Sequence, residues 1–151
     1  MHDALLFVSN LLADVINPAL VLLWLWLVVG LFRSRDNSRW RWVLASLLGV
    51  AICVAGVHLL RAEPVWPGHP YFPSGHEAFA ASVATSIAWR FGVRWGALAA
   101  LCASILAPSL VLAGFHEVWD VVASLVVCPV VTIACHVILR ISLPILPRSD
   151  R

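Results

Sequence analysis

The chain has 151 residues, of which 62% are hydrophobic, and its mean hydropathy is +0.93. Soluble domains are only about half apolar, so this composition excludes an ordinary soluble domain and favours one polytopic membrane domain covering residues 1–151. The net charge is +2, and all ten basic residues are arginines. The four cysteines fall within apolar runs, which predicts buried thiols rather than a disulfide framework.

The N-terminal region predicts one spanning helix with a second apolar stretch before it. Residues 16–32 are apolar over nearly the 20 or so positions that a spanning helix needs. Residues 4–15 are also apolar but contain Asn10 and Asp14, and Pro18 suits the first turn of a helix. We slightly favour a short helix at the membrane interface over the outer end of one long tilted helix. No basic n-region precedes it, so we expect the segment to remain as an anchor.

Four further spans are expected at residues 43–60, 74–89, 96–113 and 117–139. The third is rich in alanine, and small residues let helices approach closely in lipid. Pro108 is expected to interrupt the fourth. Residues 61–73 contain four prolines and are expected to form a loop. The predicted fold is therefore all-α, a polytopic membrane helical bundle of about five spanning helices plus a possible N-terminal interfacial helix.

The arginines predict the orientation of this bundle. Five spans place nine of the ten arginines on one side, which the positive-inside rule makes cytoplasmic. Arg61 alone lies on the other side, together with the polar segments 73–77 and 116–120. We therefore expect an integral protein of a bacterial inner (plasma) membrane whose functional site faces the extracytoplasmic side.

The first polar segment reads Pro73-Ser74-Gly75-His76-Glu77. In one interpretation it is a capping box, in which Ser74 caps a helix and Glu77 reaches back to it. In the other, the helix N-terminus exposes backbone N–H groups that favour an anion, and His76 donates a proton to a bound phosphate ester. Local sequence leaves both interpretations open.

The second polar segment contains His116 and Asp120, four residues apart. On a helix this spacing lets the two side chains touch, and a carboxylate on one ring nitrogen leaves the other free as a nucleophile or base. The alternative is an acidic first helical turn beside an interfacial histidine. We favour the functional interpretation, because an ionisable residue within a membrane span usually has a function.

A zinc site is a weaker alternative, because no close His-x-x-x-His pair is present to form it. Its candidate ligands would be His58, His69, His76, Glu77, His116 and Asp120. We expect neither a metal nor another cofactor. We expect His58 to be packed in the bundle and His136 to lie at the opposite membrane interface.

These two segments resemble motifs of the type-2 phosphatidic acid phosphatase family of membrane lipid phosphatases. The family's Pro-Ser-Gly-His motif is complete at residues 73–76. Its Ser-Arg-x5-His-x3-Asp motif keeps its spacing from Ser109 to Asp120, but Leu110 replaces the arginine. Its Lys-x6-Arg-Pro motif is not matched, although Arg61 and His69 lie in the corresponding region. The resemblance covers about residues 61–124.

The resemblance implies a metal-independent reaction in an extracytoplasmic pocket. His116 would attack phosphorus to form a phosphohistidine, Asp120 would orient it, and His76 would protonate the leaving group. The residues that would hold the phosphate are Arg61, His69, Ser74, Gly75 and Ser109. Two of the family's three cationic ligands are absent here, and such cations usually make the largest contribution to catalysis.

We therefore expect a lipid phosphate or diphosphate phosphatase whose partners are its lipid substrate and the bilayer, with no nucleic acid. A lipid-phosphate-binding protein with weak or no activity is the alternative, and a transporter subunit with a His–Asp relay is a third. The identity of the lipid and the oligomeric state are left open.

Overall fold

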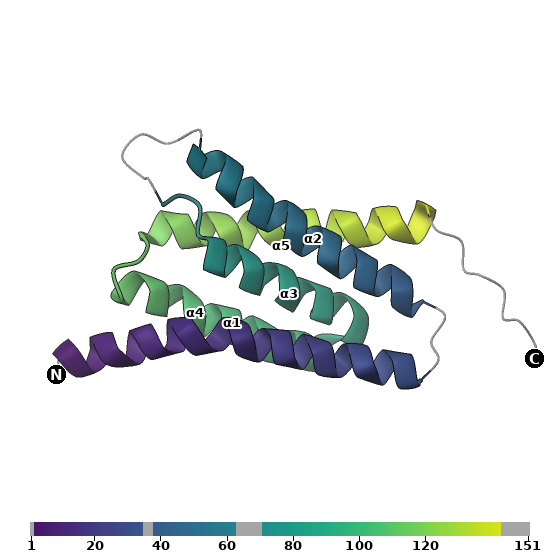
Figure 1. The fold of residues 1–151 in the computed structure, drawn as a ribbon, viewed down its shortest axis with the longest axis horizontal. Coiled ribbons are helices and arrows are strands. Elements are labelled where there is room, and N and C mark those ends of the chain that lie inside the picture. The colour runs from purple at the N-terminus through teal and green to yellow at the C-terminus, as the bar shows by residue number, and fades with distance from the viewer. Residues whose placement is uncertain (1, 35–37, 63–70, 143–151) are drawn as a thin grey trace, which may run out of the picture.

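Five α-helices make up most of the protein in the computed structural model, which describes residues 2–34, 38–62 and 71–142. They are α1 (His2–Arg33), α2 (Arg39–Ala62), α3 (Gly75–Phe91), α4 (Val93–Leu112) and α5 (Val118–Ser142). The described residues contain no strand, which confirms the predicted all-α fold. Successive helices run in alternating directions roughly along the long axis of the molecule, with α3 in the middle (Figure 1).

Four helices, α1, α2, α4 and α5, are long and apolar enough to cross a membrane. The central helix α3 has 17 residues. That length corresponds to about 25 Å, slightly less than the roughly 30 Å hydrocarbon core of a bilayer. It contacts all four other helices and buries most of its side chains against them. The chain is therefore an integral membrane protein, with its shortest helix enclosed by the four longer ones.

The N-terminal region differs from the expectation, because α1 is one continuous helix from His2 to Arg33 with Pro18 inside it. The expected break between an interfacial helix and a span is wrong, and so is the interruption of α4 at Pro108. Proline is tolerated within membrane helices because neighbouring groups satisfy the backbone atoms that it frees. The 32 residues of α1 extend for about 48 Å, so the helix must tilt or pass beyond the hydrocarbon core.

Small residues bring the helices close together, as the alanine pattern predicted. Ala80 and Ala84 are buried against the core that α1 and α4 share with α3. A Cβ atom at Gly96 would lie 2.6 Å from the Cβ of Ala88, so α3 and α4 touch at a point that only glycine permits. Such contacts matter in lipid, where association depends on close packing rather than on water exclusion.

The two ends of the bundle differ in their polar residues. We call one the arginine-rich end; of the described arginines it holds Arg33, Arg39, Arg41, Arg90, Arg94 and Arg140. It lies on the right in Figure 1. The other, the motif end, contains the starts of α3 and α5 (left in Figure 1), and Arg61 is the one described arginine there. The fold thus separates the charges as the topology prediction requires.

This separation predicts that the two ends are accessible from opposite sides of the membrane. Val93 and Phe115 are exposed at the arginine-rich and motif ends, respectively. With the native cysteines replaced by alanine, Phe115→Cys should react with an impermeant thiol reagent added outside cells. Val93→Cys should react only after permeabilisation. The reverse pattern would show that the proposed orientation is wrong, and labelling of both in intact cells would contradict a spanning bundle.

Candidate functional site

Two hydrogen bonds from the backbone of Ser74 join the two polar segments at the motif end. The Ser74 N–H donates to the carbonyl oxygen of Asp120 at 2.9 Å, and the Ser124 hydroxyl donates to the carbonyl oxygen of Ser74 at 2.9 Å. The start of α3 is therefore attached to the first two turns of α5. As a result, His76 and His116 lie near each other although 40 positions separate them in the sequence.

The start of α3 forms only half of the predicted capping box. Ser74 is the N-cap, and its hydroxyl oxygen accepts a hydrogen bond from the Glu77 N–H at 3.3 Å. The Glu77 side chain does not reach back, because the Ser74 N–H is already bonded to Asp120. Glu77 is fully buried instead, and its carboxylate oxygens have no hydrogen-bond partner among the described residues.

A tight turn after α4 places His116 immediately before α5. The Phe115 N–H donates to the Leu110 carbonyl and the Gly114 N–H to the Val111 carbonyl, both at 3.0 Å. These two bonds form a Schellman motif, and Gly114 adopts the positive φ of 75° that this motif requires. The chain therefore reverses direction within a few residues, and His116 lies two residues before the start of α5.

His116 and Asp120 form the predicted pair. The His116 Nδ1 lies 3.3 Å from the Asp120 Oδ2, and the two side chains are 6% and 3% exposed. The same Oδ2 accepts a hydrogen bond from the Glu117 N–H at 2.9 Å, so the carboxylate also holds the first turn of α5. The contact that the functional interpretation requires is therefore present, and the same carboxylate stabilises the acidic first turn that the alternative expected. With Nδ1–H donating to Asp120, the lone pair is on Nε2, which is then the nucleophilic or basic nitrogen.

The surroundings of His116 favour its neutral form. Burial lowers the pKa of His116 below its usual value; the hydrogen bond and charge of Asp120 oppose this shift, whereas the charges of Arg61 and His76 add to it. Because the folded protein disfavours the protonated ring, the Nε2 lone pair stays available at a lower pH than in an ordinary histidine. Because protonation of His116 is easier in the unfolded chain, this group lowers the free energy of unfolding as the pH falls below about 6.5.

A cavity of about 660 Å³ opens beside this pair. Its wall contains four of the predicted site residues: Arg61, Gly75, His76 and His116. Its apolar surface comes partly from Val54, Phe79 and Leu110. The cavity is therefore large enough for a phosphate group together with the adjoining part of its ester, and His58 also lines it rather than packing inside the bundle.

Two other predicted residues, Ser74 and Ser109, are placed differently. The Ser74 side chain is buried in the helix cap, and the Ser109 hydroxyl donates to the Ile105 carbonyl within α4 at 2.8 Å. Neither residue is part of the described cavity wall, because both hydroxyl groups turn toward their own helix. His69 lies outside the described residues.

Helix α1 and the segment before α3 supply residues that the sequence analysis missed. Asp14 and Asn17 line the cavity, and the Asn17 amide nitrogen donates to the His76 carbonyl at 3.3 Å. Asp14 and Asn17 are three positions apart, which places them on one face of a helix. The sequence shows this shared face only if residues 2–33 are treated as one continuous helix. Tyr71 packs edge-on against His116, with ring centroids 6.4 Å apart.

Arg61 connects the end of α2 to the segment before α3. Its Nη2 donates to the Tyr71 carbonyl at 3.2 Å and to the Pro73 carbonyl at 3.0 Å. The side chain therefore brings its charge to the cavity and also holds the backbone that leads into α3.

Within the described parts of the chain, no group of three or more histidine, cysteine, aspartate or glutamate residues is arranged to hold a metal ion. The zinc alternative thus has no ligand set there, and its candidate His69 is not described.

No family model, curated protein or solved structure matches this chain. The site is therefore interpreted from its own geometry and chemistry.

The contacts of His116 predict how its titration responds to Asp120. Asp120→Asn removes the negative charge that raises the pKa of His116 and leaves the effects of burial and of the nearby cations. The pKa of His116 should therefore fall further, as measured by NMR of ring-labelled histidine in detergent or nanodiscs. Glu117→Gln, which neutralises a neighbouring exposed carboxylate, is the matched control and should change the pKa less. An unchanged or higher pKa in Asp120→Asn would contradict the observed pairing.

Proposed function

We propose that this protein is a lipid phosphate or diphosphate phosphatase that works through a phosphohistidine intermediate. The observation that carries this proposal is the His116–Asp120 pair, which lies on a cavity shared with His76 and Arg61. Phosphoryl transfer through a covalent intermediate needs a nucleophile oriented by a second group, together with a nearby acid and a nearby cation.

In the proposed reaction, His116 Nε2 attacks phosphorus and the bond from phosphorus to the leaving oxygen breaks. His76 donates a proton to that oxygen, which leaves as the lipid alcohol or as a lipid monophosphate. Water then attacks the phosphohistidine, His76 accepts its proton, and inorganic phosphate is released while His116 regains its lone pair. Asp120 holds the Nδ1 proton of His116 and offsets the positive charge that the ring carries in the intermediate.

The phosphate would lie at the start of α3. The Gly75 and His76 backbone is near the N-terminus of that helix, where unpaired N–H groups and the helix dipole favour anions. Arg61 supplies a full positive charge at the same cavity. Together they replace part of the stabilisation that the missing motif cations would provide.

A lipid is the proposed substrate because the cavity lies at the end of a membrane bundle and has apolar walls. The arginine distribution supports a site on the extracytoplasmic side of the membrane. The bilayer would then hold the acyl or prenyl chain while the phosphate enters the polar cavity.

A second candidate function is lipid-phosphate binding without efficient turnover, and Leu110 favours it. This residue occupies the motif position of an arginine, is fully buried and contributes to the cavity wall. A site with one described arginine stabilises the transferring phosphoryl group less than a site with three cations.

The mechanism predicts that His116→Ala abolishes phosphate release from purified protein given a panel of lipid phosphates, while the protein stays folded. Asp120→Asn should slow turnover by roughly 10²- to 10⁴-fold, by analogy with the loss of the orienting carboxylate in a serine-protease triad. The amide can still accept the Glu117 N–H, so thermal stability should fall little. Glu117→Gln should keep its activity.

Trapping of a base-stable phosphohistidine distinguishes the candidates directly. Wild-type protein quenched with base during turnover of a ³²P-labelled lipid should retain label on histidine, and His116→Ala should not. Turnover that persists in His116→Ala would refute the mechanism. Binding without any release of phosphate by the wild-type protein would favour the second candidate.

The shortage of cations leads to a separate prediction. One charge-assisted hydrogen bond contributes about 1.5–3 kcal/mol, so Arg61→Ala should lower kcat/KM by roughly 10- to 100-fold. Arg61→Lys should recover part of this loss, because lysine keeps the charge but lacks the planar fork. Leu110→Arg should strengthen phosphate binding, because its side chain would start from the cavity wall.

Arg61 also bonds two carbonyl groups, so thermal stability must be measured alongside. Equal kcat/KM for Arg61→Ala and wild type would exclude Arg61 as a phosphate ligand. A Leu110→Arg variant that loses thermal stability without binding phosphate more tightly would indicate that this part of the cavity wall cannot accommodate a guanidinium group.

A further inference from the structure

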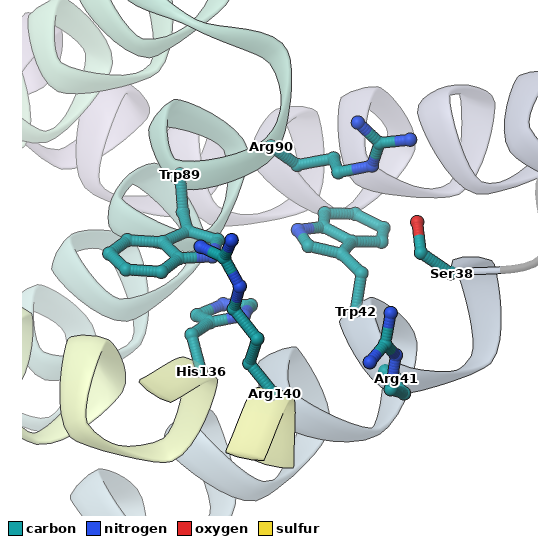
Figure 2. Close-up of a pocket in the computed structure, with 7 residues that line it drawn as sticks. All are labelled: Ser38, Arg41, Trp42, Trp89, Arg90, His136 and Arg140. Atoms are coloured by element: carbon teal, nitrogen blue, oxygen red, sulfur yellow. The ribbon is translucent and has the colours of Figure 1, made fainter. Parts of the chain in front are cut away.

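A second cavity, of about 330 Å³, lies at the arginine-rich end, at the opposite end of the bundle from the motif residues. Its wall comes from α2, α3 and α5 and from the residue just before α2 (Figure 2). The lining residues are Ser38, Arg41, Trp42, Trp89, Arg90, His136 and Arg140. This cavity contains none of the residues assigned to the phosphatase site, so it needs a separate explanation.

The floor of this cavity is held in place by Ser86. The Trp42 Nε1–H donates to the Ser86 carbonyl at 2.8 Å, and the His136 Nε2 lies 3.1 Å from the Ser86 hydroxyl oxygen. Trp89 stacks on His136 with ring centroids 5.6 Å apart and planes 18° apart. Trp42 and His136 are each only 4% exposed, so both rings are buried against the neighbouring helices at this end of the bundle. The aromatic walls are therefore built into the helix packing.

Arginines from three different helices surround these walls: Arg41 from α2, Arg90 from α3 and Arg140 from α5. Figure 2 shows the side chains of Arg41, Arg90 and Arg140 around this cavity together with the rings of Trp42 and Trp89. No carboxylate is among the described residues that line the cavity. The polar groups facing it are thus hydroxyl, ring nitrogen and guanidinium groups, a set rich in donors and suited to an anion.

We propose that this cavity binds the phosphate group of an anionic phospholipid in the leaflet at the arginine-rich end. Guanidinium groups match phosphate oxygens in a two-point geometry. Tryptophan is favoured at the headgroup level of a bilayer. Basic pockets between membrane helices are a known way of holding lipid headgroups.

The surface next to the cavity favours a lipid over soluble phosphate. Beside Arg140, α5 exposes Ile133, Val137 and Ile141, which recur at four-residue spacing and form one apolar stripe. Trp89, which lines the cavity, is 42% exposed. An acyl chain can therefore lie along α5 while its phosphate occupies the cavity, an arrangement that free phosphate cannot use.

The test compares lipid retention by the full-length protein in nanodiscs. The discs contain phosphatidylcholine with or without phosphatidylglycerol, and native mass spectrometry counts the lipids that stay bound. Wild-type protein should retain phosphatidylglycerol and should unfold at a higher temperature in its presence. Because each lost charge-assisted bond weakens binding about tenfold or more, the double variant Arg90→Gln/Arg140→Gln should lose most of this retention and stabilisation.

The matched control is Arg33→Gln/Arg94→Gln, which removes the same charge from the same end but from residues outside the cavity wall. It should retain phosphatidylglycerol nearly as wild type does. Equal losses in the two double variants would refute the proposal, because the attraction would then be a general property of the charged surface. Arg140 is exposed near the end of α5, so the single variant Arg140→Gln tests the site with little risk to folding and should show a partial loss.

A further arm identifies the source of the phosphate group. Inorganic phosphate is added to discs of pure phosphatidylcholine and to discs with phosphatidylglycerol. The lipid proposal requires that inorganic phosphate raises the unfolding temperature little in discs of pure phosphatidylcholine. It also requires that inorganic phosphate displaces little bound phosphatidylglycerol from the mixed discs. Equal stabilisation by inorganic phosphate, together with displacement of the lipid, would overturn it in favour of a soluble ligand.

Discussion

The candidate site depends on the hydrogen bonds that join the backbone of Ser74 to α5. The first N–H groups of a helix have no partner within it, and in an apolar surrounding an unsatisfied backbone group costs several kcal/mol. Here Asp120 and Ser124 provide partners for the N–H and carbonyl groups of Ser74. The requirement to satisfy this backbone therefore also sets the position of one motif relative to the other.

Several polar groups at the motif end have more than one role. The Asp120 Oδ2 accepts from both His116 and the Glu117 N–H, so one carboxylate orients the histidine and starts α5. The guanidinium group of Arg61 holds the segment before α3 and faces the cavity. Few polar groups are available in so apolar a chain, and their shared use means that structural and functional effects of a mutation must be separated by measuring stability.

Helix α3 links the two cavities. Its first turn contributes Gly75 and His76 to the cavity at the motif end, and its last turns contribute Trp89 and Arg90 to the cavity at the arginine-rich end. Its small residues allow all four longer helices to pack around it. The proposed catalysis and the proposed lipid binding thus depend on one central element while using separate residues.

The sequence by itself determined the helical membrane fold, the opposite placement of arginines and motifs, and the pairing of His116 with Asp120. These features follow from hydropathy, charge and four-residue spacing, which are local properties. Only the tertiary structure decided that α1 is continuous and that Asp14 and Asn17 line the cavity. It also decided that Ser74 and Ser109 turn away from the cavity, and that Arg41, Arg90 and Arg140 line one cavity with the buried Trp42. These outcomes depend on which groups meet after the helices pack, and a sequence pattern does not specify that.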